Sequence, residues 1–232
     1  MNKYRHEYKY LIDDRQMAVL KMRAEGILKR DPHAGLEGSY HIKSLYFDDM
    51  ANSCYRENEA GTDPRSKFRI RYYDKDLCSL KLEKKSKERG MTKKEACRIT
   101  LEECEVLMRR EISKLPFGLP PEKQMLLAEL KIRGLIPKVI VEYQRIPFVA
   151  PAGNVRITLD SDIVSSGQVE NFLSESQTRR PVLPRGNSVL EVKFDEFLPS
   201  YIKEALFLDS LQWTSFSKYY LCRKYSTNGG II

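Results

Sequence analysis

Basic side chains alternate with apolar ones in segment after segment of this chain. Residues 66–74 read SKFRIRYYD, in which Lys and Arg take alternate positions and Phe, Ile and Tyr lie between them. A two-residue period is that of a β-strand, because successive side chains point to opposite faces. We predict such strands over 3–12, 41–48, 66–74, 79–87, 91–99, 138–149, 155–162 and 188–195.

Helical signals fall between and after these strands. Asp13 or Asp14 caps the first helix, and Thr100 with Glu103 has the spacing of a capping box. Helices are predicted over 14–29, 101–115, 122–132 and 201–208, with an amphipathic segment over 215–225. Short connections between strands favour antiparallel pairing, so we expect an α+β fold in one domain over 1–232.

Composition narrows the function classes. The chain has 232 residues, 41% of them hydrophobic, and 40 Lys and Arg against 32 Asp and Glu, a net charge of +8 that favours polyanionic partners. No run is long and apolar enough for a membrane span, and the first residues show no apolar leader. Five Cys without a CxxC motif and three His favour neither disulfides nor a zinc site, so we expect a cytoplasmic protein.

The recurrence of charge on so many strands constrains the fold further. A single charged strand face is usually the solvent side of a sheet. A closed barrel with helices packed outside leaves only its lumen for the charged side, and unpaired charges there are too costly for a dry core. We therefore predict a roughly eight-stranded antiparallel β-barrel whose lumen holds a polyanion, with carboxylates pairing some cations or binding a divalent metal. The alternation assigns to this lumen Arg5, Lys9, Lys67, Arg69, Arg71, Lys81, Lys85, Arg145, Arg156 and Lys193, with Glu7, Glu83, Asp160 and Glu191.

An ordered set of segments resembles the triphosphate tunnel metalloenzymes, a CYTH-like superfamily, and within it the VTC (vacuolar transporter chaperone) domain of polyphosphate polymerases. The matching segments are YRHEYKYLI (4–12), SLYFDD (44–49), KFRIRYY (67–73), LKLEKKSK (80–87), VEYQRIPF (141–148), VRITLD (155–160), VLEVKFD (189–195) and FSKYYLCRKY (216–225). The resemblance implies a tunnel that binds ATP or polyphosphate with Mn²⁺ or Mg²⁺.

The resemblance also implies roles for individual residues. Phosphate-binding positions are Lys9, Arg69, Arg71, Lys81, Arg145 and Lys193, with Ser217 and Lys218 near the C-terminus and either Lys93 or Lys94 after a hairpin. Arg69, Arg71, Lys81 and Lys193 are expected to act on the transferred phosphate. Glu191 is the expected metal ligand, helped by Glu7 or Glu83.

One departure separates two branches of the superfamily. CYTH members usually begin with Glu-x-Glu-x-Lys, whereas this chain has Arg5-x-Glu7-x-Lys9. The loss of one carboxylate favours the VTC-like reaction, in which the terminal phosphate of a growing chain attacks the γ-phosphate of ATP. The SPX domain and membrane helices of eukaryotic VTC proteins are not seen, so we expect the catalytic module, and association with a membrane partner stays open.

Alternative interpretations stay open as well. In the first alternative, the module is a CYTH-type hydrolase of tripolyphosphate or nucleoside triphosphates. In the second, it is a non-catalytic module that binds polyphosphate or RNA. Arg69 and Arg71 on a solvated strand face, or Glu191 in a cross-strand ion pair with Lys193, would need no ligand. Nucleic acid is not expected, because Tyr and Phe fall mostly on the face opposite the cations, whereas bases would stack on aromatic rings beside them.

Overall fold

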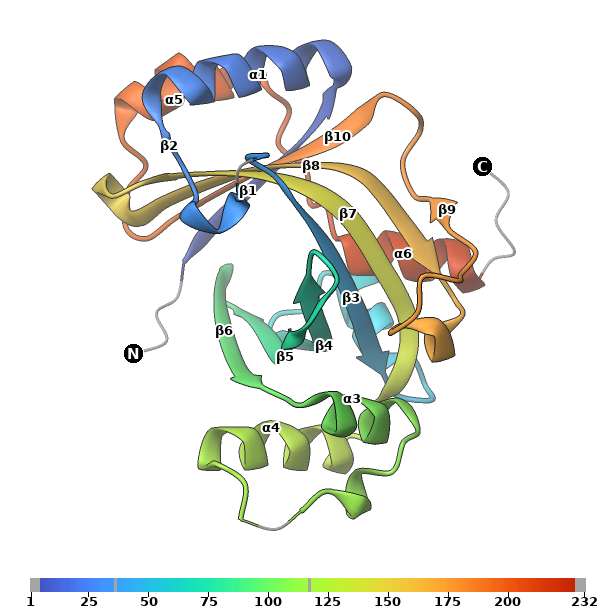
Figure 1. Ribbon diagram of the computed structural model, residues 1–232. Helices are drawn as coiled ribbons and strands as arrows, with labels where there is room; N and C mark the ends of the chain where they lie inside the picture. The colour runs from blue at the N-terminus through green and yellow to red at the C-terminus, as the bar shows by residue number, and fades with distance from the viewer. Residues whose placement is uncertain (1–4, 36, 117, 228–232) are drawn as a thin grey trace.

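The computed structural model describes residues 5–35, 37–116 and 118–227. Within these residues, ten strands form one curled antiparallel sheet (Figure 1). The main path runs β1 (His6–Asp13), β10 (Asn187–Phe194), β8 (Val155–Ser166), β7 (Ile136–Ala150), β3 (Tyr40–Asp48), β4 (Arg65–Tyr73), β5 (Asp76–Glu88) and β6 (Met91–Arg98). Two short strands, β2 (Lys29–Arg30) and β9 (Arg180–Pro181), pair with β7 and β8. The α+β class and the eight-stranded antiparallel arrangement are confirmed.

The two ends of this path meet. The Arg5 amide donates to the Thr92 carbonyl at 3.1 Å, and the Thr92 amide donates to the Arg5 carbonyl at 3.2 Å. This bridge joins the chain just before β1 to β6 and gives the sheet its barrel-like curl. The side chains on the concave face therefore converge from strands that are not neighbours in the sheet.

Helices cover the convex side of the sheet in two places. α1 (Asp14–Ile27) and α5 (Ser200–Ala205) lie over β1 and β10, and α3 (Leu101–Met108) and α4 (Pro121–Ile132) lie over β5 and β6 (Figure 1). α6 (Lys218–Thr227) packs against β7, β8 and α2 (Ser53–Glu59). Among the described helices, none is long and apolar enough to cross a membrane.

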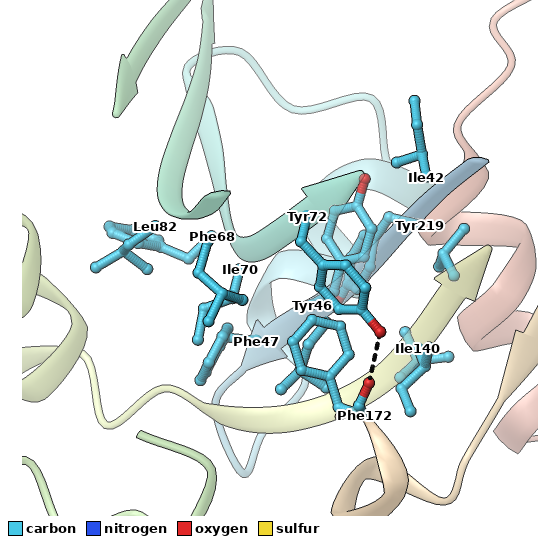
Figure 2. Close-up of a cluster of buried hydrophobic side chains, with 14 of the residues drawn as sticks. Ile42, Tyr46, Phe47, Phe68, Ile70, Tyr72, Leu82, Ile140, Phe172 and Tyr219 are labelled. Carbon is cyan, nitrogen blue, oxygen red and sulfur yellow. Dashed lines mark hydrogen bonds between the residues drawn. The ribbon is translucent and has the colours of Figure 1, made fainter. Parts of the chain in front are cut away.

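The apolar halves of the alternating strands form the core beneath these helices. Phe47, Phe68, Ile70 and Leu82 are completely buried in the larger cluster (Figure 2). Burial of each such side chain contributes about 1.5–3 kcal/mol relative to its exposure. Because these residues hold one strand face in the core, their alternating neighbours must project to the concave side.

Both predicted helix caps are confirmed. The Asp13 carboxylate accepts a hydrogen bond from the Gln16 amide at 2.8 Å. The Thr100 hydroxyl accepts one from the Glu103 amide at 3.1 Å, which completes the second capping box. Short-range side-chain spacing was sufficient to locate both helix starts.

Two helix predictions need correction. The helix expected over 101–115 ends at Met108, because Arg110 adopts a left-handed backbone with φ of 65°. The helix α2 was not predicted, since its sequence SCYRENE has no apolar stripe. It forms because the buried Asp48 carboxylate accepts hydrogen bonds from the Cys54 and Tyr55 amides at 2.8 and 3.1 Å.

Candidate functional site

The strand register places the predicted charged positions on one face. Directly opposed residues in an antiparallel pair share a side of the sheet. The opposed pairs are Lys9 and Glu191, Glu7 and Lys193, Lys193 and Arg156, Arg145 and Asp160, Arg69 and Glu83, Arg71 and Lys81, and Lys67 and Lys85. We call this set, with Lys94 and Lys218, the luminal cluster. An ion pair between Lys85 on β5 and Glu7 on β1 crosses between strands that are not neighbours, so the face is an interior.

The deepest part of the luminal cluster centres on Asp160, which is completely buried. Arg145 donates to both oxygens of this carboxylate, with nitrogen–oxygen distances of 2.6 and 2.7 Å. Lys218 at the start of α6 donates to Asp160 Oδ2 at 2.5 Å. Burial alone would raise the pKa of Asp160, but Arg145 and Lys218 hold it below its ordinary value. Two cations thus share one carboxylate here.

A second group lies where β1 and β10 pair. Glu191 Oε1 lies 2.9 Å from Lys193 Nζ, and Glu191 Oε2 lies 3.2 Å from the Arg145 guanidinium. Glu7 Oε1 lies 3.1 Å from Lys9 Nζ, and Glu7 Oε2 forms an ion pair with Lys85. Burial would raise the pKa of Glu7, but Lys85 and Lys9 lower it to about 2, so the carboxylate is ionised throughout the neutral range.

A third group forms on β4, β5 and β6. Arg69 Nε lies 2.7 Å from Glu83 Oε2, the Arg71 guanidinium lies 3.9 Å from the same oxygen, and Lys94 contacts Glu83 Oε1. Burial would raise the pKa of Glu83, but Arg69 and Arg71 bring it far below the ordinary value. Arg71 also donates to the Tyr143 hydroxyl at 3.2 Å. Each arginine fork is thus already oriented toward oxygen atoms.

Lys67 differs from its neighbours because, within the described part of the chain, it has no carboxylate partner. Its Nζ donates to the Ser217 hydroxyl at 3.3 Å. Burial, followed by repulsion from Lys85 and Lys9, lowers the pKa of Lys67 well below its ordinary value. Burial likewise lowers the pKa of Lys85 to about 8, against the attraction of Glu7. These amines are held close together with too few anions, which is an unfavourable arrangement in the absence of a ligand.

A cavity of about 210 Å³ opens onto this crowded region. Its inner wall includes Lys9, Lys67 and Lys85, and the segment before α6 closes one side, where Lys9 Nζ donates to the Phe216 carbonyl at 2.8 Å. The remaining lining residues are Glu7, Asn58, Glu59, Gly61, Arg65, Ser66, Lys87, Gly90, Thr92, Thr214, Ser215 and Ser217. A small anion in this cavity would meet ammonium groups on several sides.

Two predicted residues, Arg5 and Arg156, are paired at the edge of the lumen, and a third, Lys81, lies beside Arg71 and Tyr73. Arg5 turns toward Asp195, with Nε 2.9 Å from Oδ1. Arg156 lies at the rim, where it donates to the Tyr40 hydroxyl at 2.9 Å and pairs with Asp31 at 2.7 Å. Lys81 lies 5.9 Å above the Tyr73 ring, and the described residues include no ion-pair partner for it.

The two candidates after the hairpin are separated by the register. Lys94 opposes Lys85 and points into the lumen, whereas Lys93 opposes Ser86 and lies on the outer face, 3.4 Å from Glu95. Of the two alternatives, the luminal position belongs to Lys94, and the placement of Lys93 in the lumen is corrected. The alternation alone gave no means to choose, because the hairpin turn decides which residue opposes Lys85.

Tyrosines also line the lumen, contrary to the prediction that they avoid the cationic face. Tyr46 accepts from Arg69 at 2.8 Å, and Tyr143 and Tyr73 lie beside Arg71. Burial would raise the pKa of Tyr73, but Arg71 lowers it to about 8. The period-two pattern itself contained this signal, since Tyr143 is in phase with Arg145. The argument against nucleic acid from aromatic placement is therefore removed.

The carboxylates of the lumen bear on metal binding. Among the described residues, no group of three or more His, Cys, Asp or Glu side chains is arranged to hold an ion. Glu7 and Glu191 nevertheless lie close together on paired strands, since Lys9 Nζ is 3.1 Å from Glu7 Oε1 and 4.0 Å from Glu191 Oε1. Two carboxylates fit Mg²⁺ or Mn²⁺, which often take one or two carboxylates and complete their shell with water and phosphate oxygens. Glu83 is paired with cations as Glu7 and Glu191 are, but Lys9 contacts both of those carboxylates, whereas among the described residues the cations on Glu83 contact no second luminal carboxylate. Glu83 therefore fits less well.

Solved structures with the same fold come from plants and bacteria. A Hippeastrum protein, described as a putative adenylyl cyclase with a dominant triphosphatase activity, matches with a TM-score of 0.55 and 15% identity over 100% of this chain and 98% of that chain. A putative adenylate cyclase from Vibrio parahaemolyticus matches at 0.51 and 11% identity, over 95% and 98%. At these identities the likeness establishes the triphosphate tunnel fold. A search of curated proteins found no match.

The sequence itself identifies the family. The family model of the VTC domain matches residues 4–226, nearly the whole chain. This confirms the resemblance drawn from the ordered segments. The luminal cluster lies within those segments except for Lys94 on β6, and its members are on strands except for Lys218 on α6. The chain belongs to the VTC domain family.

Proposed function

We propose that this protein is a metal-dependent phosphotransferase that binds ATP and polyphosphate in the lumen and extends the polyphosphate chain. The observation that carries the proposal is the imbalance of charge in the luminal cluster. Cations outnumber carboxylates there, and within the described residues Lys67 and Lys81 have no ion-pair partner. Closely spaced cations with too few anions repel one another, so the arrangement is matched to a ligand that supplies several negative charges at once.

Phosphoryl transfer needs positioning and charge neutralisation more than a protein nucleophile. Arg69 and Arg71 would grip phosphate oxygens with two donors each, and Lys81 and Lys193 would supply compact charges around the transferred group. Other phosphates along the chain would be held by Lys9, Lys67, Lys85, Lys94, Arg145, Ser217 and Lys218. Arg5 and Arg156, which pair with Asp195 and Asp31, would bind phosphate at the edge of the lumen. The luminal carboxylates hold these donors in place before the ligand enters.

Glu191, with Glu7 beside it, is our proposed ligand set for Mg²⁺ or Mn²⁺. When bound, such an ion supplies further neutralisation of phosphate oxygens. Both carboxylates are ionised at neutral pH, because Lys193 acts on Glu191 and Lys85 on Glu7 against the effect of burial. They are thus in the protonation state that binds a cation.

Hydrolysis of a triphosphate is the second candidate. The shared contact of Glu7 and Glu191 with Lys9 favours it, because two neighbouring carboxylates that would hold a metal also suit the orientation of an attacking water. The triphosphatase activity in the description of the Hippeastrum structure points the same way. The two candidates use the same lumen and differ in whether phosphate or water is the acceptor.

One experiment separates the candidates. The protein is incubated with ATP and Mn²⁺ or Mg²⁺, and ADP, free phosphate and polyphosphate are measured. A polymerase yields ADP and polyphosphate in matched amounts, whereas a hydrolase yields free phosphate. Loss of product in an Arg69→Met/Arg71→Met variant, with activity kept in Lys93→Met, would assign the reaction to the lumen. No ATP consumption with either metal would contradict both candidates.

A further inference from the structure

A pair of stacked tyrosines lies beside the mouth of the luminal cavity. Tyr55 on α2 and Tyr220 on α6 have ring centroids 5.3 Å apart and planes inclined by 17°. Both hydroxyls donate to Glu59 Oε1, each at 3.2 Å. Two helices distant in sequence therefore present one flat aromatic and carboxylate surface.

This surface adjoins the phosphate-binding cavity. Glu59 lines the cavity together with Lys67 and Lys85, and Ser217, three residues before Tyr220, accepts from Lys67. The cavity is thus cationic at its inner wall and has one exposed carboxylate, Glu59, on its α2 side. The two tyrosines lie next to the cavity lining and reach it through their hydrogen bonds to Glu59. A carboxylate at this position repels an inorganic phosphate chain, so phosphate binding does not account for Glu59.

The cavity therefore has two chemically different sides, the cationic inner wall and the α2 side with Glu59. A ligand that matches both has several phosphates at one end and a flat group that donates a hydrogen bond at the other. A nucleoside triphosphate with an exocyclic amine on its base, such as one carrying adenine, has this form. Its base would stack on a ring while its amine donates to Glu59.

We propose that Glu59, Tyr55 and Tyr220 form a nucleobase subsite at the cavity mouth, which selects an amine-bearing nucleotide over inorganic polyphosphate as the phosphoryl donor. This deepens the proposed function and rests on it. Tyr55 packs against the apolar core, and both rings of the pair are half-buried, so part of the stacked pair stays open to a base. Glu59 adds selection by repulsion, because it disfavours a bare phosphate chain at the same place.

The experiment compares the binding of ATP, inosine triphosphate and tripolyphosphate to the intact protein by competition. Inosine carries a carbonyl where adenine carries its amine, and its neighbouring N1 carries a proton, so it tests whether the exocyclic amine is the group that donates to Glu59. Tripolyphosphate lacks the base and reports on the lumen alone. Glu59→Gln and Tyr220→Leu are the test variants. Glu57→Gln removes the same charge from the same helix, at a side chain paired with Arg133, and is the control.

We expect the wild-type protein to bind ATP more tightly than inosine triphosphate. Glu59→Gln should abolish this preference and weaken ATP binding about tenfold, while tripolyphosphate binding is unchanged or tighter. Tyr220→Leu should weaken both nucleotides about tenfold and leave tripolyphosphate unchanged. Glu57→Gln should behave as wild type for all three ligands.

Two results would overturn the subsite. The first is a parallel change for all three ligands in both test variants, and the second is no change for any ligand. Because Glu59 is exposed, Glu59→Gln keeps the test decisive even if Tyr220→Leu proves unstable. A wild-type protein that binds none of the three ligands would instead refute the proposed function itself, and the subsite with it.

Discussion

Replacing Asp160 with asparagine removes the carboxylate that holds two buried cations. Arg145 donates to both of its oxygens at 2.6 and 2.7 Å, and Lys218 donates to one of them at 2.5 Å. The change keeps the size of the side chain but replaces one of its two acceptor oxygens with an amide donor. Its main effect is therefore to leave the positive charges of Arg145 and Lys218 less compensated in a buried place.

The expected cost follows from this burial. Removal of one partner from a buried ion pair destabilises proteins by about 3–5 kcal/mol. Glu191 lies 3.2 Å from the Arg145 guanidinium and remains, so we expect the lower end of that range, about 3 kcal/mol. A polyphosphate that enters the lumen should replace the missing charge, so it should bind the variant more tightly, by about tenfold.

Urea unfolding with and without tripolyphosphate measures both effects. At saturating ligand, tenfold tighter binding adds about 1.4 kcal/mol to the stabilisation that the wild type gains. Asp162→Asn is the control, since this carboxylate is two residues away and exposed. A loss below about 1 kcal/mol without ligand, or equal stabilisation of both proteins by tripolyphosphate, would refute the view that Asp160 and phosphate compete for the same cations.

Three further predictions concern the same lumen. Arg71→Ala should weaken tripolyphosphate binding by about tenfold to a hundredfold, because the two hydrogen bonds of a charged guanidinium to phosphate are lost. Circular dichroism should show that the variant is folded. Unchanged affinity in calorimetry would count against a role of Arg71 in phosphate binding. Glu191→Ala should abolish the stimulation of ATP turnover by Mn²⁺ or Mg²⁺, and a metal titration identical to wild type would remove Glu191 from the metal site. Affinity for tripolyphosphate should fall as pH rises through about 8, because Lys85, whose pKa lies near 8, loses its charge there. This pH dependence should weaken in Lys85→Met. A flat wild-type affinity between pH 7 and 9.5 would contradict the assignment of Lys85 to phosphate binding.

The strand faces could be predicted because they depend on neighbouring residues only. The alternation of Lys, Arg and apolar residues in 66–74 requires one face for each set, whatever the rest of the chain does. The resemblance of the ordered segments to a known family then predicted that these strands form a tunnel. Lys9, Arg69, Arg71 and Lys193 consequently lie where the sequence placed them.

What the sequence could not provide depends on distant partners. Asp160 and Lys218 are 58 residues apart in the sequence, and no local sequence pattern predicts their contact. The helix α2 depends on the buried Asp48 carboxylate rather than on its own periodicity. The choice between Lys93 and Lys94 depends on the hairpin register, in which one step exchanges the two faces of the strand.

The most direct test of the central claim is calorimetric titration of tripolyphosphate into two variants and the wild type. Arg69→Met/Arg71→Met removes two luminal charges, and Lys93→Met removes a charge from the outer face of β6. We predict that the luminal variant loses at least a hundredfold in affinity, whereas Lys93→Met binds as the wild type does. Equal losses in the two variants, or a wild type that does not bind tripolyphosphate at millimolar concentration, would contradict a phosphate-binding lumen.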